Sequence, residues 1–302
     1  MSAPASEIAA GPAGAQTFAT ARADRFGALR RLLHEPLGSL GLVLVLTIIL
    51  VAISADLLMP YDPNGVSVKE RLLSPSAAHW LGTDQLGRDV FSRVIAGSRI
   101  ALWVALVSMV FSLSGGISLG LIAGYGPRWL DSILILMFDS IRSFPTVMFA
   151  LAVVTILGPS LNTIIFIIVV FNIPTYARIV RTQTLSLRNT EFILAERSLG
   201  AGPLRVLIVH MLPNVIGPLL ILASMDIPVV ITIEAGLSFL GLGVRPPTAS
   251  WGSILNDGYS FIRNTPWLVI AGGVPLILAT LGFTFLGEAL RDAFDPRLRK
   301  DV

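Results

Sequence analysis

The chain has 302 residues, of which 54% are apolar and only 14% are charged, and its mean hydropathy is +0.77. Such a composition offers too little polar surface to cover a soluble globule, and it predicts a polytopic membrane protein. The formal net charge is +3. Because the basic residues stand beside apolar runs and not in a stripe interleaved with aromatics, nucleic-acid binding is not expected. The absence of Cys excludes disulfides, thiolate metal sites and cysteine nucleophiles.

The first 36 residues are rich in Ala and end in a basic sequence. An organellar transit peptide would avoid acidic residues, whereas this segment contains Glu7, Asp24 and Glu35. The first apolar run begins too late and is too long for a cleavable signal peptide. Residues 1–36 are therefore predicted to form a cytosolic N-terminal tail, followed by the first transmembrane helix at 37–59.

Six apolar runs are long enough to cross a bilayer, which takes roughly 20 residues of helix. They cover residues 37–59, 98–124, 131–157, 161–180, 207–237 and 266–289. The runs predict an all-α polytopic membrane protein with six transmembrane helices and both termini on one side. Fourteen Lys and Arg residues fall on the segments that lie on the same side as the termini and seven on the segments of the opposite side. The positive-inside rule therefore places both termini and residues 191–206 in the cytosol.

Residues 60–97 form the longest polar connection between the predicted spans, and several prolines interrupt it. We expect an outer, periplasmic loop with at most a short helix. Asp84, Arg88 and Asp89 lie close enough in sequence to pair and to fold the segment on itself. A solvated cap is favoured here over direct contact with a partner.

Four ionisable residues inside the spans are candidates for a pathway or an interface, because such groups are costly in hydrocarbon and face a bundle interior or water. Asp139 and Arg142 are three residues apart on one helix, so an ion pair and a pathway role are both open. Asp226 and Glu234 are eight residues apart and are expected to share a face of the fifth span. Pore lining or interface bonding is favoured for both over direct binding of substrate.

The run Gly116-Ile117-Ser118-Leu119-Gly120 matches the G-x-S-x-G pattern of serine hydrolases. It lies inside an apolar helix, where glycines recur every fourth position up to Gly124, and that spacing is typical of close helix packing. No catalytic residue is therefore predicted. No metal site is expected either, since the three histidines fall in the tail, the outer loop and the inner boundary. Helix kinks are predicted at Pro145, Pro174, Pro213, Pro218 and Pro228.

Between the fifth and sixth spans, Gly241 and Gly243 precede the pair Pro246 and Pro247, which predicts a rigid outer turn. Three aromatic residues flank this turn and are expected at the membrane–water boundary: Trp251, Tyr259 and Trp267.

The segment 191–214 is a charged, helix-forming island between two apolar runs. Gly200 and Gly202 are expected to break it into two short helices, and Pro203 suits the first turn of the second. The charges of Glu191, Glu196, Arg197 and Arg205 indicate a solvent-facing surface. A docking surface for a soluble partner and a plain solvated loop are both open on charge pattern alone.

The residues of this island carry a resemblance to a known family. The pattern is Ala195-x-Arg197-Ser198-Leu199-Gly200-Ala201, followed by Arg205, His210, Leu212, Pro213 and Asn214. It resembles the EAA loop of binding-protein-dependent ABC importers. One departure is visible: the usual first Glu of the family falls on Leu194, and an acidic residue stands two positions later at Glu196. Residues 81–97, 237–255 and 285–300 also resemble the C-type permease subunit of the peptide and nickel branch.

The resemblance implies a type I importer permease core in the last five spans, at residues 98–290, with cytosolic coupling helices at about 190–206 and a short cytosolic tail at 291–302. It implies ATPase coupling through Glu191, Ala195, Glu196, Arg197, Gly200, Ala201 and Arg205. The implied partners are a second permease, two cytosolic ATPase subunits that bind ATP and Mg²⁺, and an extracytoplasmic binding protein, in a bacterial inner membrane. The chain itself has no G-x-x-x-x-G-K-[ST] run and needs no cofactor of its own.

Two other classes of protein compete with this interpretation. A motor-free secondary transporter or channel would be expected to show an internal repeat with paired broken helices, which the two halves of the chain do not show. An intramembrane hydrolase would depend on Ser118 alone. The resembling branch carries di- and oligopeptides, nickel, glutathione and opine-like solutes, and peptide is the first choice for this chain.

Overall fold

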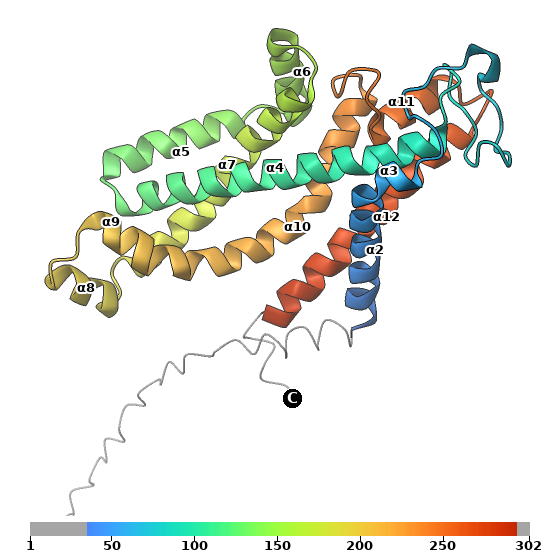
Figure 1. Ribbon diagram of the computed structural model, residues 1–302. Coiled ribbons are helices and arrows are strands. Elements are labelled where there is room, and N and C mark those ends of the chain that lie inside the picture. The colour runs from blue at the N-terminus through green and yellow to red at the C-terminus, as the bar shows by residue number, and fades with distance from the viewer. Residues whose placement is uncertain (1–34, 295–302) are drawn as a thin grey trace, which may run out of the picture.

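The computed structural model describes residues 35–294 as an all-helical chain (Figure 1). Predictions for residues 1–34 and 295–302 lie outside the described part. The helices are α2 (Pro36–Ile53), α3 (Ala55–Leu58), α4 (Val90–Tyr125), α5 (Arg128–Arg142), α6 (Thr146–Leu157), α7 (Leu161–Leu187), α8 (Glu191–Ser198), α9 (Pro203–Arg205), α10 (Leu212–Phe239), α11 (Trp251–Ser260) and α12 (Trp267–Phe294). A 3₁₀ turn covers Val68–Glu70 and a π-helical turn covers Val206–Met211.

Five helical segments are long and apolar enough to cross a membrane: Pro36–Ile53, Val90–Tyr125, Leu161–Leu187, Pro203–Phe239 and Trp267–Ala293. The predicted span at 131–157 is a pair of helices, α5 and α6, that meet at 91°. Pro145 explains the break, because it lacks a backbone donor and disfavours a helical conformation at the residue before it. The bent pair brings the number of candidate spans to six if it is counted as one, and the all-helical membrane fold is confirmed.

A stripe of glycines lets α4 and α7 pack closely. A Cβ on Gly116 would lie 2.4 Å from Cβ of Tyr176, and a Cβ on Gly120 would lie 2.6 Å from the carbonyl oxygen of Ala177. Only glycine fits at such distances. The hydroxyl of Ser118 donates to a carbonyl oxygen one turn earlier in its own helix, at 2.8 Å. The glycine spacing is therefore a packing feature, as predicted.

The first helix, α2, is held by contacts from α12 and α4. A Cβ on Gly41 would lie 2.6 Å from the backbone nitrogen of Leu286, so the two helices touch at backbone distance. Arg99 of α4 donates from Nε to the carbonyl oxygen of Ala52, at 2.7 Å, and from both terminal nitrogens to Asp56. The Arg99 guanidinium lowers the pKa of the Asp56 carboxyl through these hydrogen bonds. Arg99 thus caps the carboxyl end of α2.

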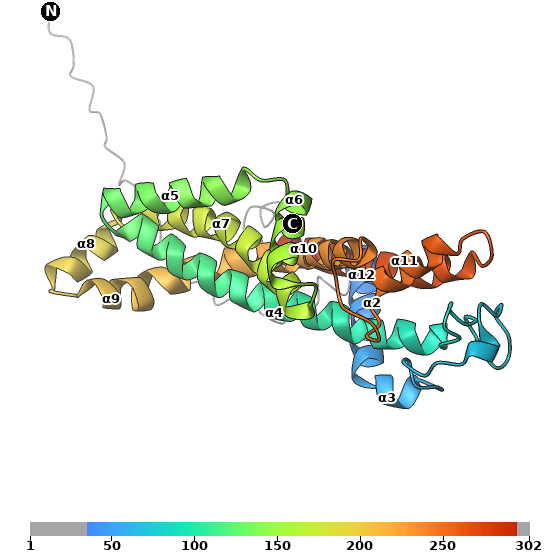
Figure 2. The same cartoon turned by 90° about the horizontal axis from the view of Figure 1, so that it is seen from above.

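Helix α4 has 36 residues, about 54 Å at 1.5 Å per residue, and separates two ends of the molecule. Helices α8 and α9 lie at one end, which we call the α8 end (Figures 1 and 2). Helix α11 and the loop between α3 and α4 lie at the other, which we call the α11 end. The two regions that the sequence singles out are thus far apart in space.

Candidate functional sites at the two ends of the bundle

The charged island at the α8 end is a short helix followed by a turn and the start of a long helix. Helix α8 ends at Ser198, and the chain then turns into Pro203, where the next helix begins. The prediction of a second short helix is wrong, because the helix that begins at Pro203 continues to Phe239. The turns at Val206–Met211, just before Pro213, are π-helical. A regular α-helix would clash with the proline ring at this point.

Gly200 makes the turn after α8, as predicted. Its φ is +89°, in the left-handed region that glycine adopts without a steric penalty. Its N–H donates to the carbonyl oxygen of Arg197, and the N–H of Ala201 donates to that of Glu196, both at 3.0 Å. These bonds satisfy carbonyl groups at the end of α8. The turn therefore fixes the direction in which the chain enters the long helix.

One side of α8 is anchored and the other is exposed. Ile193 is fully buried and belongs to the main apolar core together with Val206. Four large apolar side chains are exposed around it: Phe192, Leu194, Leu199 and Leu204. Leu199 is 84% exposed. Glu191, Arg197 and Arg205 are exposed beside them. We call these seven exposed residues the α8 face; an exposed apolar patch with a charged rim is typical of a protein interface.

Three other predicted coupling residues of this segment do not belong to the α8 face. Glu196 is half-buried, and its Oε2 lies 3.4 Å from Nε2 of His210 at the start of the long helix. Ala201 is half-buried in the turn, and Ala195 is exposed while its carbonyl oxygen accepts from Leu199. Glu196 therefore faces its own chain, which a sequence pattern alone does not reveal.

Two ion pairs join α5 to α7, the helix that leads into α8. Asp139 pairs with Arg178, and Asp131 pairs with Arg181 through two hydrogen bonds, with 2.7 Å between Nη2 and Oδ2. Of the two alternatives left open for Asp139 and Arg142, an ion pair between them is not observed, because Arg178 of the neighbouring helix pairs with the Asp139 carboxylate instead. Arg142 is exposed at the end of α5, next to the bend.

Asp226 and Glu234 of α10 lie in different surroundings. Tyr176 of α7 donates its hydroxyl to Oδ2 of Asp226 at 2.6 Å, and Asp226 is half-buried. Glu234 is fully buried, and Ser238 donates its hydroxyl to Oε1 of Glu234 at 2.7 Å. Within the described part of the chain Oε2 of Glu234 has no hydrogen-bond partner. Glu234 is thus an internal packing residue of this subunit, and of the two only Asp226 retains exposed surface.

A buried cluster of charged residues organises the α11 end. Asp84 accepts from Nε of Arg88 at 2.6 Å and from the backbone N–H groups of Leu86 and Arg88. Asp89 lies 2.9 Å from Nδ1 of His79. The prediction that this segment folds on itself is confirmed. The four side chains of this cluster are buried, and Asp84 is only 1% exposed. Most residues from Tyr61 to Ala78 are exposed, so the solvated cap stays a prediction.

The same cluster starts α4 earlier than the predicted boundary at residue 98. Asp89 accepts from the backbone N–H of Ser92 at 2.8 Å and so caps a helix that begins at Val90. Trp251 of α11 packs against this first part of α4. Its Nε1 donates to the carbonyl oxygen of Val94 at 3.0 Å, and the residue is 2% exposed. The prediction of an interfacial aromatic is therefore wrong for Trp251, although Tyr259 and Trp267 are exposed.

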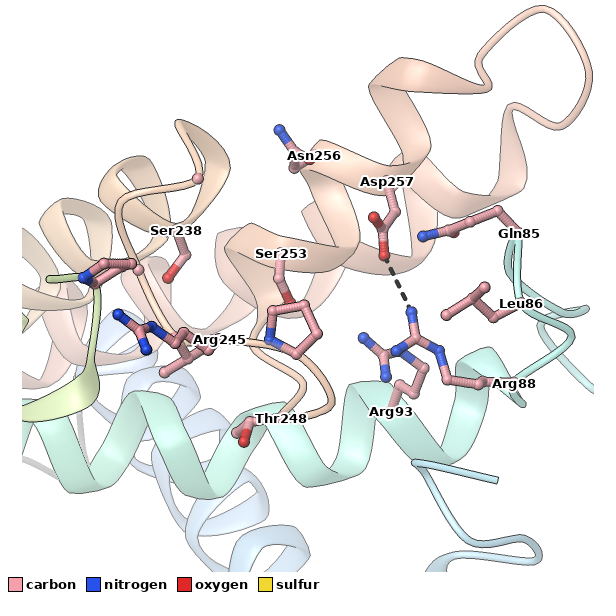
Figure 3. Close-up of a pocket in the computed structure, with 15 residues that line it drawn as sticks. Gln85, Leu86, Arg88, Arg93, Ser238, Arg245, Thr248, Ser253, Asn256 and Asp257 are labelled. Carbon is pink, nitrogen blue, oxygen red and sulfur yellow. Dashed lines mark ion pairs between the residues drawn. The ribbon is translucent and has the colours of Figure 1, made fainter. Parts of the chain in front are cut away.

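A cavity of about 280 Å³ opens between the start of α4, helix α11 and the loop before it (Figure 3). Its wall includes Gln85, Arg88, Arg93, Ser238, Arg245, Thr248, Ser253, Asn256 and Asp257. Nη2 of Arg88 lies 3.6 Å from Oδ2 of Asp257. Burial raises the pKa of the Asp257 carboxyl above its ordinary value, while the guanidinium groups of Arg93 and Arg88 act in the opposite direction. Sequence reasoning found Arg88 here but missed Arg93, Arg245 and Asp257.

In residues 35–294 no group of three or more His, Cys, Asp or Glu side chains is placed to hold a metal ion. Long apolar helices, a buried cluster of charged residues at the α11 end and the exposed α8 face define a multi-pass membrane protein with a distinct surface at each end.

The chain belongs to the family of binding-protein-dependent transport system inner membrane components, whose model matches residues 116–300. The N-terminal transmembrane domain of oligopeptide transport permease C matches residues 27–75. These matches confirm the resemblance to the peptide and nickel branch, C-type subunit. The chain is thus the permease subunit of a binding-protein-dependent ABC importer and a multi-pass inner membrane protein. In this family separate subunits handle ATP, and the permease has no ATPase activity.

Three relatives show the breadth of the branch. The dipeptide transport system permease protein DppC of Alkalihalophilus pseudofirmus is 39% identical over 90% of each chain. The glutathione transport system permease protein GsiD of Pectobacterium atrosepticum is 39% identical over 89% of this chain and 90% of its own. The nickel transport system permease protein NikC of Escherichia coli is 39% identical over 86% of this chain and 94% of its own.

Among solved structures, a chain of the inward-facing MetNI methionine ABC transporter is similar to this one. The TM-score is 0.51 at 20% sequence identity, over 67% of this chain and 96% of that chain. At this identity the similarity concerns the fold, and it supports the type I importer permease core.

Proposed function

We propose that this subunit forms, with a second and related permease, the translocation path for di- or oligopeptides that the binding protein delivers, and that two cytosolic ATPase subunits drive the path through the α8 face. The names of the relatives support a peptide-type solute, with glutathione and nickel as the other chemistries represented. The exposed α8 face is the observation on which the coupling proposal depends.

The helices around the α8 face can transmit force into the bundle. Ile193 fixes α8 to the core, and the helix after the Gly200 turn is continuous from Pro203 to Phe239. The helix before α8, α7, is tied to α5 by the pairs of Arg178 and Arg181. A load on α8 therefore reaches α5, α7 and α10 together. ATP shifts such an equilibrium only if the ATPases bind the two states of the permease with different affinity, and docking on α8 provides that difference.

This proposal requires both termini and the α8 end to lie in the cytosol. The excess of basic residues on all segments that lie on the same side as the termini supports that orientation. The buried cluster of charged residues lies at the opposite end of α4, which agrees with this orientation.

Because the chain has no Cys, single-cysteine variants test the orientation and the docking directly. We expect the Leu199→Cys variant to react with a membrane-impermeant maleimide only after the cytoplasmic side is opened, and to be protected by the ATPase subunits. The Val68→Cys variant, altered at an exposed position of the α11 end, should react in intact spheroplasts. The reverse accessibility would show that the orientation is wrong. Equal labelling of the Leu199→Cys variant with and without ATPases would remove the docking proposal.

A further inference from the structure

Two cavities meet at the α11 end, and Arg245 lines both. The first is the cavity of about 280 Å³ in Figure 3, and the second, of about 620 Å³, lies beside the start of α7. Pro159, Pro246 and Thr248 also line both cavities. A Cβ on Gly158 would lie 2.8 Å from a terminal nitrogen of Arg245, so the guanidinium lies against the turn between α6 and α7.

The wall of the first cavity carries more positive than negative charge. It contains the guanidinium groups of Arg88, Arg93 and Arg245 but one carboxylate, that of Asp257. Asp84 lies behind the wall and is bonded to Arg88. Even with both carboxylates counted, these five groups leave one positive charge in excess. Glu234 lies behind Ser238, is fully buried and does not line the cavity.

The arginines of the wall retain unused donors. Arg93 is only 2% exposed, and its Nη1 donates to the carbonyl oxygens of Pro63 and Pro247. Its Nε approaches Oδ2 of Asp84 at 3.4 Å but has no hydrogen-bond acceptor among residues 35–294. Arg245 forms no ion pair within the same range. A buried donor without an acceptor is costly, and an anion in the cavity would supply one.

Two helix N-termini add to the positive electrostatic potential of the cavities. Ser253, in the first turn of α11, lines the first cavity, while Ser160 and Leu161 at the start of α7 line the second. The N-terminus of a helix carries partial positive charge, which favours anions. Guanidinium forks match the geometry of a carboxylate in particular. A hydrated divalent cation would be repelled by the same wall.

We propose that this pair of cavities binds a carboxylate group of the solute at the entrance to the path, with Arg245 as the direct contact. The proposal rests on the proposed function and narrows it to solutes that carry a carboxylate, such as a peptide with a free carboxyl terminus. It excludes a free metal cation as the species held at this site.

A single-cysteine reporter in the complete importer tests the site without ATP. Thr248 is exposed and lines both cavities, so Thr248→Cys in nanodisc-embedded importer reports occupancy by its rate of maleimide labelling. We expect Ala-Ala and S-methylglutathione to slow the labelling and the C-terminal amide of Ala-Ala to have no effect. In the Arg245→Gln background, half-protection should need at least about tenfold more Ala-Ala, the effect of losing one charge-assisted hydrogen bond. Arg263→Gln, at an exposed site outside the cavities, is the matched control.

Several results would overturn the proposal. One is the absence of protection by both carboxylates in the Thr248→Cys reporter and in a second reporter, Leu86→Cys. The others are equal protection by the amide and equal protection in the Arg245→Gln background. Protection by the solute-free binding protein alone that is lost in the Arg245→Gln background would instead show that the cavity receives an acidic side chain of that protein. Because labelling needs no ATP, these failures are separate from a failure of ATPase-driven transport, which would concern the proposed function.

Discussion

Gly200→Val is expected to abolish solute uptake by the reconstituted importer and to uncouple it from ATP hydrolysis, so that the binding protein no longer stimulates the ATPases. Gly200 has a φ of +89°, and a side chain in the left-handed region costs about 1–2 kcal/mol, with β-branched residues the least tolerated. No atom lies within 4 Å of a Cβ built on Gly200, so the effect would come from the backbone and not from a clash. Relief of the strain would rotate α8 relative to the helix that begins at Pro203.

The matched control for this prediction is Gly202→Ala. Gly202 has a φ of −69° and a Cβ there also meets nothing within 4 Å, so alanine fits without strain. Uptake and stimulated ATP hydrolysis are measured in proteoliposomes for both variants at equal permease content. Normal values for Gly200→Val in both assays would show that the turn does not couple the ATPases to the path.

Asp84→Ala is expected to cause the largest loss of stability in the polar cap at the α11 end. Asp84 is 1% exposed and is the carboxylate that Arg88 and Arg93 share, at 2.6 and 3.4 Å. Removing one partner of a buried ion pair leaves uncompensated charge and costs about 3–5 kcal/mol. For a domain of this size the midpoint of thermal unfolding should fall by on the order of 10 °C. Thermal unfolding of the permease in detergent measures the change.

Asp56→Ala provides the comparison for Asp84→Ala. Asp56 also pairs with an arginine, Arg99, but both side chains are exposed, at 76% and 40%. Solvent screening makes such a pair contribute little, so this variant should unfold close to the unmodified protein. A loss of stability no larger in Asp84→Ala than in Asp56→Ala would show that the buried cluster does not hold the cap together.

The sequence allowed correct prediction of the features that depend on local chemistry. Apolar runs indicated the number and approximate place of the spans, because length and hydropathy suffice for that. The turn at Gly200 follows from the preference of glycine for positive φ, which also depends on one residue and its neighbours. The spacing of Gly116 and Gly120 likewise indicated close packing before the neighbouring helix was known.

Predictions about contacts between distant segments were wrong, or the contacts were not predicted at all. Asp139 has a possible partner three residues away, yet Arg178 from another helix takes that place. Trp251 is of a residue type that is common at the membrane–water boundary, but it packs against α4. Its hydrogen bond goes to Val94, which stands 157 residues earlier in the chain. Arg245 stands in a loop, and only the folded chain brings it to the two cavities. Spacing along a helix contains no information on any of these neighbours.

Uptake of a labelled peptide into proteoliposomes tests the central claim most directly. The permease subunits are reconstituted with the binding protein supplied outside, and the two ATPase subunits and internal ATP are added or left out. Uptake is predicted only when ATPases and ATP are both present and only with this chain in the membrane. Uptake by the permease chains alone, down or against a gradient, would contradict an import path driven from outside the bilayer.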